Sequence, residues 1–169
     1  MGDEGLEKLL LAEIKIVFKY LIKIGSSKED AEDITQDTLY KIIKNIDAIP
    51  EDKIRPWLFK VSINSYYNLY NRRKKQDNNA LEEIDSIRLL SENVEETILT
   101  KESKKKVHGV LNLLKPSYKD LLILKYLMDF SYKDIGDILE LSEYQVKTYL
   151  YRARNKFREI WEELNYEGK

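Results

Sequence analysis

The sequence predicts an all-α protein made of two small helical domains joined by a flexible linker. Apolar residues recur at helical spacing through most of the 169 residues, and no segment keeps the alternation typical of a strand. Between the two helical parts, residues 77–103 are polar and then acidic. Such a long stretch is uncommon inside one compact domain. We therefore expect domains at 1–76 and 104–169, with the linker at 77–103.

The composition excludes several kinds of site. The chain has no Cys and a single His, His108, which argues against disulfides, metal centres and histidine-based relays. We expect no metal, no cofactor and no enzymatic activity. The chain also lacks an apolar run of about 18 residues and a secretory signal, so we expect no membrane insertion and a cytoplasmic location.

Charge is unevenly distributed along the chain, although the net charge is −1. Residues 51–80 hold seven basic and three acidic side chains, and residues 101–169 hold 14 basic and 11 acidic. Between them, residues 81–100 hold one basic and six acidic side chains. Two basic segments favour a nucleic-acid-binding protein with two contact surfaces. A solvated surface on which charges cluster is the alternative.

The first two predicted helices each carry one apolar face. The first ends at Gly25, and Ser27 is the predicted N-cap of the second, with Asp30 three residues later. The stripe predicted for the first helix comprises Leu6, Leu9, Leu10, Ile14, Val17, Phe18 and Leu21. The inner face predicted for the second helix comprises Ala31, Ile34, Thr35, Thr38, Leu39, Ile42, Ile43 and Ile46.

A third helix follows the break at Pro50. Pro56 suits its first turn, and the helix runs into the basic cluster Arg72, Arg73, Lys74 and Lys75. These cations could follow a nucleic-acid backbone or simply complement the helix dipole. Three tyrosines of this helix could stack on bases or fill the core: Tyr66, Tyr67 and Tyr70.

The C-terminal part predicts four helices, the last two of which form a helix-turn-helix. They are expected at about 104–114, from Pro116, at 131–139 and at 143–163, with a turn at 140–142. Ile135, Leu139, Val146 and Leu150 have the spacing of anchors between two crossing helices. Gly136 stands where those helices approach closely.

Between its anchors the last helix presents a polar and basic face. Residues 142–158 hold five basic side chains and one acidic. Such side chains can reach base edges near the start of the helix and phosphates further along. An amphipathic, solvated helix is the alternative. The face comprises Lys147, Thr148, Tyr151, Arg152, Arg154, Asn155 and Lys156.

Residues 31–43 and 55–64, together with the helix-turn-helix, resemble bacterial RNA polymerase sigma factors of the extracytoplasmic-function (ECF) group. The resemblance covers about residues 5–75 and 105–163. It implies a region 2-like domain, a region 4-like domain and a subunit that directs core polymerase to promoters. It also implies three partners: core RNA polymerase through its β′ clamp helices and β subunit, promoter DNA, and an anti-sigma factor.

The resemblance assigns the contact with the β′ clamp helices to Asp33, Gln36 and Asp37. Their spacing places all three on one helical face, and an acidic face suits a basic partner helix. Acidic residues near a helix start also complement its dipole, which is a purely structural explanation for Asp33. A metal site built from these carboxylates is disfavoured because no His accompanies them.

The resemblance assigns recognition and opening of the −10 element to Trp57, Lys60, Asn64, Arg72 and Arg73. Larger relatives carry a second Trp where this chain has Leu58, so Trp57 could pack in the core instead of stacking on DNA. Asn64 could bind an extruded base through its amide or could simply be a solvated helix residue.

The resemblance assigns the −35 element to Lys147, Thr148, Tyr151 and Arg152, with Arg154 and Lys156 following. The chain departs from the family at Tyr144 and Gln145, where a small Gly-Thr pair is usual. It also departs at Tyr149, where a basic residue is frequent. The −35 preference is therefore expected to differ from that of better-known relatives.

Two other classes of protein fit part of this pattern. A stand-alone helix-turn-helix regulator would bind a palindrome as a dimer. A helical protein-interaction module would not need Lys147 or Arg152. The stand-alone regulator has no reason to carry the set at Asp33, Gln36 and Asp37. The acidic linker could mimic nucleic acid near a basic channel or could simply be soluble.

Overall fold

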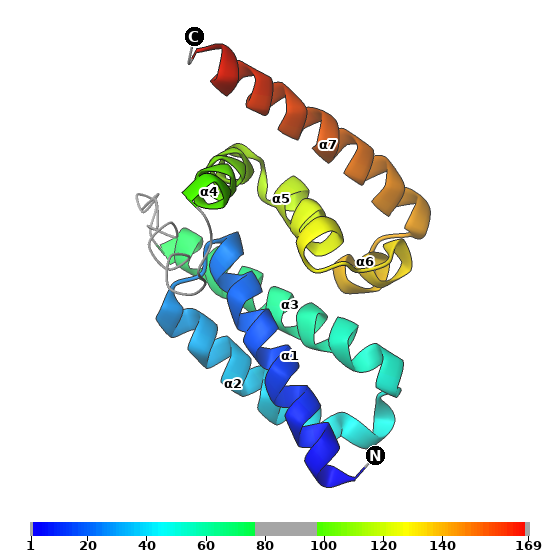
Figure 1. The fold of residues 1–169 in the computed structure, drawn as a ribbon. Coiled ribbons are helices and arrows are strands. Elements are labelled where there is room, and N and C mark those ends of the chain that lie inside the picture. The colour runs from blue at the N-terminus through cyan, green and yellow to red at the C-terminus, as the bar shows by residue number, and fades with distance from the viewer. Residues whose placement is uncertain (1, 77–97, 168–169) are drawn as a thin grey trace. The chain divides into compact units, whose positions relative to one another are not determined.

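The computed structural model describes residues 2–76 and 98–167, which form two compact units. Every regular element in these residues is a helix, and no strand occurs among them, which confirms the all-α prediction (Figure 1). Most of the predicted linker lies outside the described residues. Each unit is therefore described by itself.

The N-terminal unit is a bundle of three helices, in which each helix contacts the other two (Figure 1). They are α1 (Asp3–Ile24), α2 (Lys28–Asn45) and α3 (Ile54–Gln76). Two short 3-10 turns, η1 (Ile46–Ala48) and η2 (Glu51–Lys53), join α2 to α3. In the core the rings of Tyr20 and Phe59 meet edge to face, with their centroids 5.4 Å apart. Both side chains are fully buried.

The predicted boundary between α1 and α2 is confirmed. Gly25 adopts a left-handed conformation with φ of 114°, and its N–H closes the last turn of α1. Residues other than Gly rarely adopt this backbone conformation, so a Gly at this position marks the end of the helix in the sequence. Ser27 then caps α2, because its Oγ accepts a hydrogen bond of 3.1 Å from the backbone N–H of Asp30.

The buried stripe differs from the prediction at several positions. Ile43 was predicted to face inward but is 58% exposed, since it lies about 100° around α2 from the buried Ile42. Tyr20 was absent from the predicted stripe of α1 and is fully buried. The predicted members Leu10, Val17 and Leu21 are buried as expected.

Two hydroxyl groups meet inside the N-terminal unit. The Oγ1 of Thr38 and the Oγ of Ser62 are 3.0 Å apart, and both residues are fully buried. Thr38 also donates to the carbonyl of Ile34 at 2.7 Å. Because each buried hydroxyl has a partner, this polar contact joins α2 to α3 without leaving an unsatisfied group.

The C-terminal unit packs three shorter helical segments against one long helix, α7 (Glu143–Tyr166) (Figure 1). The shorter segments are α4 (Ile98–Leu113), α5 (Pro116–Leu122) and α6 (Tyr132–Leu139). A π-helical turn, η4 (Ile123–Leu127), extends α5. The helix predicted to begin at about 104 begins at Ile98, so residues 98–103 of the predicted linker are helical.

The helix-turn-helix geometry is confirmed at α6 and α7. Ile135, Val146 and Leu150 are fully buried. Ile138 completes the inner face of α6 and is almost fully buried, whereas the predicted anchor Leu139 is half-buried.

Gly136 occupies the tightest point of this motif. A Cβ atom there would lie 2.6 Å from the carbonyl oxygen of Leu141, and the N–H of Leu141 donates to the Gly136 carbonyl at 2.9 Å. The backbone of the turn therefore comes too close for a side chain. Ser142 and Gln145 then begin α7 with a capping box, in which each side chain accepts from the other's backbone N–H.

Candidate nucleic-acid and partner interfaces

The outer face of α2 is polar and open to solvent. Asp33, Gln36 and Asp37 are all exposed and lie on one side of the helix, as their spacing predicts. Asp37 forms an ion pair with Lys41 at 2.7 Å, in which its side chain is 54% exposed. Because solvent screens such a pair, it stabilises α2 little and leaves the carboxylate accessible to a partner.

The exposed side of α3 forms a continuous polar stripe. At about 100° per residue, the predicted −10 residues Trp57, Lys60, Asn64 and Arg72 fall on one face of the helix. Trp57 and Lys60 are half-buried, and Asn64 and Arg72 are exposed. The same face carries three further exposed polar residues. We call the whole set the α3 stripe: Trp57, Lys60, Asn64, Asn68, Asn71, Arg72 and Lys75.

The end of the α3 stripe borders an open hollow lined by Asn68, Asn71, Arg72 and Lys75. Amide groups can bind base edges and cations can bind phosphates, so this lining suits nucleic acid. Asn68 and Asn71 were not among the residues predicted from the sequence. Their spacing from Asn64, four and seven residues on, is the signal that would have found them.

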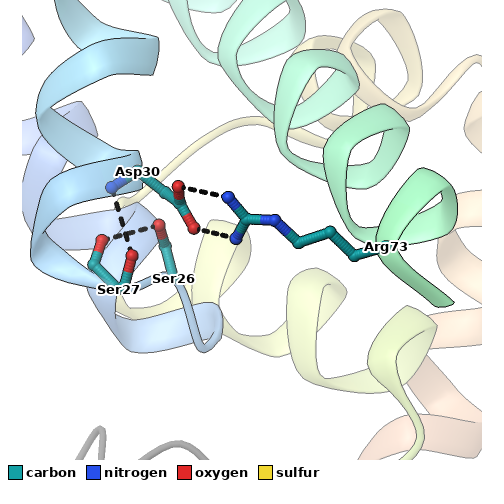
Figure 2. A network of polar contacts seen from close by, with 4 residues as sticks. All are labelled: Ser26, Ser27, Asp30 and Arg73. Carbon is teal, nitrogen blue, oxygen red and sulfur yellow. Dashed lines mark hydrogen bonds and ion pairs between the residues drawn. The ribbon is translucent and has the colours of Figure 1, made fainter. Parts of the chain in front are cut away.

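Arg73 lies away from the α3 stripe. Its guanidinium binds the carboxylate of Asp30 through two hydrogen bonds, of 2.5 and 2.9 Å (Figure 2). The bond from Arg73, followed by that from the Ser27 hydroxyl, holds the pKa of Asp30 below its usual value, although partial burial opposes the shift. The two residues are 43 positions apart, and no local pattern predicted their contact.

Tyr66 is engaged within the fold. Its hydroxyl donates to the carbonyl of Ile24 at 3.4 Å, and its ring meets that of Tyr67 edge to face at 5.1 Å. Tyr70 lies beside it and is 43% exposed. Tyr66 therefore packs within the fold. The exposed ring of Tyr70 is accessible for stacking on a base.

The first turns of α7 carry the predicted −35 residues on their open side. Lys147, Tyr151 and Arg152 are exposed, and Thr148 is half-buried. Lys147 lies 3.7 Å from Glu143 in a solvent-exposed ion pair, and the Arg152 guanidinium lies 5.8 Å from the centre of the Tyr149 ring. Such weak contacts leave these cations able to exchange partners.

The other two predicted −35 residues are engaged within the unit. Arg154 donates to the Tyr126 hydroxyl at 3.0 Å, which connects α7 to η4 and raises the pKa of the guanidinium further. The sequence pattern did not indicate that Tyr126 would contact Arg154. Lys156 forms an exposed ion pair of 3.1 Å with Glu159 on the flank of α7.

The described residues contain no group of three His, Cys, Asp or Glu side chains that could hold a metal ion. Across 2–76 and 98–167, no helix is both long enough and apolar enough to cross a membrane.

Two family models match the chain, one in each unit. Sigma-70 region 2 matches residues 9–76, and Sigma-70, region 4 matches residues 104–157. The chain therefore belongs to the sigma-70 family of RNA polymerase sigma factors, in the ECF group. Such a factor is not an enzyme, and it directs core RNA polymerase to promoters. Neither alternative class, a stand-alone regulator or a general interaction module, accounts for both matches in this order.

The relatives agree with this assignment over most of the chain. The ECF RNA polymerase sigma factor SigM of Bacillus subtilis is 28% identical over 145 residues, which are 86% of this chain and 88% of that protein. The ECF sigma factor SigW of the same organism is 24% identical over 158 residues, 88% of this chain and 84% of that protein.

Two solved structures share the fold. One is sigma factor RpoE in complex with the anti-sigma factor NepR from Bartonella quintana, with a TM-score of 0.74 and 23% identity, covering 94% of this chain and 98% of that chain. The other is CnrH in complex with the cytosolic domain of CnrY, with a TM-score of 0.65 and 19% identity, covering 95% and 90%.

Proposed function

We propose that the two domains, 1–76 and 104–169, divide promoter recognition between them. The N-terminal domain binds core polymerase and the −10 element, and the C-terminal domain reads the −35 element. The observation that carries this proposal is that each unit presents a polar, basic helix face that is largely exposed: the α3 stripe, and the open side of α7.

The docking surface for polymerase is the outer face of α2. Asp33, Gln36 and Asp37 are exposed and contribute nothing to the core. Two carboxylates and an amide suit the basic β′ clamp helices, and complementary charge would speed the encounter. We expect these side chains to matter for binding core polymerase and little for the stability of the unit.

At the −10 element, the α3 stripe follows the opened strand. Asn64 can bind the edge of an extruded base, Lys60 and Arg72 can bind phosphates, and Trp57 is half-buried beside them. Spaced 18 residues apart, Trp57 and Lys75 are separated by about 27 Å of helix, which is long enough to track several nucleotides.

At the −35 element, the start of α7 enters the major groove. Lys147, Thr148, Tyr151 and Arg152 reach base edges or adjacent phosphates, as in other helix-turn-helix proteins. Lys156 lies further along α7, where it can bind a phosphate of the DNA backbone. Arg154 holds η4 against α7, so its contribution to DNA binding is expected to be smaller than that of Arg152.

In vitro transcription with core polymerase tests these assignments. Asp33→Ala with Asp37→Ala should abolish promoter-dependent transcripts because core binding is lost, as seen in gel filtration. Lys147→Ala with Arg152→Ala should retain core binding and lose −35-dependent transcription. Lys105→Ala, which removes an exposed cation of α4, is the matched control and should leave both unchanged. Normal transcription from the α7 variant would contradict the −35 assignment.

We also propose that an anti-sigma factor regulates this chain and that it acts in the cytoplasm. The support is that RpoE and CnrH, which share its fold, were solved with NepR and with the cytosolic domain of CnrY. Such a partner should compete with core polymerase for the α2 face. Cell fractionation that placed the chain away from polymerase would contradict the location.

A further inference from the structure

The last turns of α3 carry four consecutive cationic side chains, and one of them, Arg73, differs from the others in its contacts. Both terminal nitrogens of Arg73 bind the Asp30 carboxylate. Within 2–76 and 98–167, no acidic side chain pairs with Arg72, Lys74 or Lys75. Every residue from Tyr70 to Gln76 is exposed, so few packing contacts restrain this end of the helix. The ion pair with Asp30 therefore restrains the direction of this end of α3.

The acceptor of this pair is itself held in place. Asp30 lies in the first turn of α2, where the Ser27 hydroxyl accepts a hydrogen bond from its backbone N–H at 3.1 Å, and its side chain is only 15% exposed (Figure 2). A guanidinium bound through two parallel hydrogen bonds has one orientation relative to the carboxylate. The ion pair therefore orients the end of α3 relative to the start of α2.

The pair lies between the two surfaces assigned above. Asp30 precedes Asp33, the first residue of the proposed docking face, by three positions on α2. At about 100° per residue, Arg73 lies about 100° around α3 from Arg72 and about 160° from Lys75, away from the α3 stripe. When Arg73 holds Asp30, Arg72 and Lys75 are turned outward.

We propose that Asp30 and Arg73 are positioning residues for promoter binding. Their ion pair fixes the last turns of α3 against the start of α2, so that a polymerase holding α2 presents the α3 stripe to DNA in one orientation. Arg73 makes no phosphate contact itself. This inference rests on the proposed −10 role of α3, and it removes Arg73 from the DNA-contact residues assigned by resemblance.

The test uses holoenzyme assembled on core polymerase and the promoter fragment that the wild-type holoenzyme selects from random-sequence duplex DNA. Promoter affinity is measured against salt concentration for D30N, R73Q, their double variant and the charge swap D30R/R73D. R72Q is the matched control, because it removes one cation from the α3 stripe. Core binding is measured in parallel, because a variant that only unfolds the unit loses it.

We expect D30N, R73Q and their double variant to weaken promoter affinity by the same factor, about threefold to fivefold, with core binding retained. Their salt slopes should equal that of the wild type. R72Q should lower the slope by about 0.7, because one phosphate contact with the opened strand is lost. The charge swap should recover most of the affinity, since it restores the pair with its polarity reversed.

Three results would overturn the proposal. R73Q could lower the salt slope as R72Q does, which would make Arg73 a phosphate contact. D30N could raise promoter affinity, which would make Asp30 a competitor of DNA. The charge swap could bind worse than either single variant. If the wild-type holoenzyme selects no promoter at all, the proposed function itself fails, and that outcome is separate from these three.

Discussion

The two units hold their DNA-facing helices in different ways. In the C-terminal unit, the anchors of α7 alternate with its exposed residues: Val146 and Leu150 are buried, while Lys147 and Tyr151 face solvent. The turn that orients the helix directly precedes it. In the N-terminal unit, the end of α3 is held by Asp30, 43 residues earlier in the chain.

This difference shows which kind of surface a sequence reveals. A helix oriented by its neighbours in sequence leaves a contiguous pattern of anchors and exposed side chains. When a helix is oriented by a distant segment, the sequence shows only the periodicity of that helix. The residue that holds it is identified only from the folded structure. Variants of each unit can test how far the two differ in this respect.

The largest effect should come from the core of one unit alone. Phe59→Ala removes a fully buried ring that packs against Tyr20, and we expect it to destabilise the N-terminal unit by about 3–5 kcal/mol. Hydrogen exchange resolved by segment should show lost protection in α1–α3 and unchanged protection in α4–α7. Loss of protection throughout the chain would show that the units do not fold independently.

Next, Gly136→Ala should disrupt the helix-turn-helix. The new Cβ would lie 2.6 Å from the Leu141 carbonyl oxygen, and relieving that contact should cost about 1–3 kcal/mol. Gly109→Ala is the matched control, because open space surrounds that position in α4. It should stabilise the unit by about 0.5–1 kcal/mol through helix propensity alone. Thermal unfolding of both variants gives the comparison, and equal effects would contradict the crowding at Gly136.

Loss of the cap that begins α7 should have a smaller effect. Ser142→Ala removes the hydroxyl that accepts from the Gln145 N–H, and should destabilise the C-terminal unit by about 1 kcal/mol. Ser142→Gly should cost only a few tenths of that, because Gly suits the cap conformation. Denaturant unfolding measures both. A larger loss for Gly than for Ala would show that the capping bond is not what stabilises this helix start.

The smallest effect should be a pH dependence confined to the N-terminal unit. The pKa of Asp30 is lowered by Arg73, so the folded state binds its proton less readily than the unfolded state. The stabilisation is fully present above the ordinary Asp pKa of 3.8 and is lost as the pH falls through the lower folded value. Because Arg73 is 60% exposed, the pair should contribute at most about 1 kcal/mol.

The variant D30N is the control for this pH dependence. Unfolding measured between pH 6 and pH 3 should show a difference between wild type and D30N that shrinks toward acid. A difference that stayed constant over this range would show that the carboxylate charge does not stabilise the unit.

Much of the fold followed from the sequence because its signals are local. Gly25 marks a helix end through its left-handed conformation, Ser27 through its capping hydroxyl and Pro56 through its fit to a first turn, and the structure confirms each of them. The inward-facing Ile43 was a wrong prediction, because position around a helix decides burial and hydrophobicity alone does not. Tyr20 was missed since its hydroxyl makes it ambiguous in a pattern of apolar residues.

From the sequence alone, short-range periodicity predicted the helical class and the helix-turn-helix, and the resemblance to a known family supplied the three sets of candidate residues. The packing of the helices revealed which of those residues are held by a distant partner. It paired Arg73 with Asp30. It also engaged Arg154 with Tyr126. The physical reason is that an ion pair or hydrogen bond between distant segments depends on how their helices pack, and packing is a property of the whole unit.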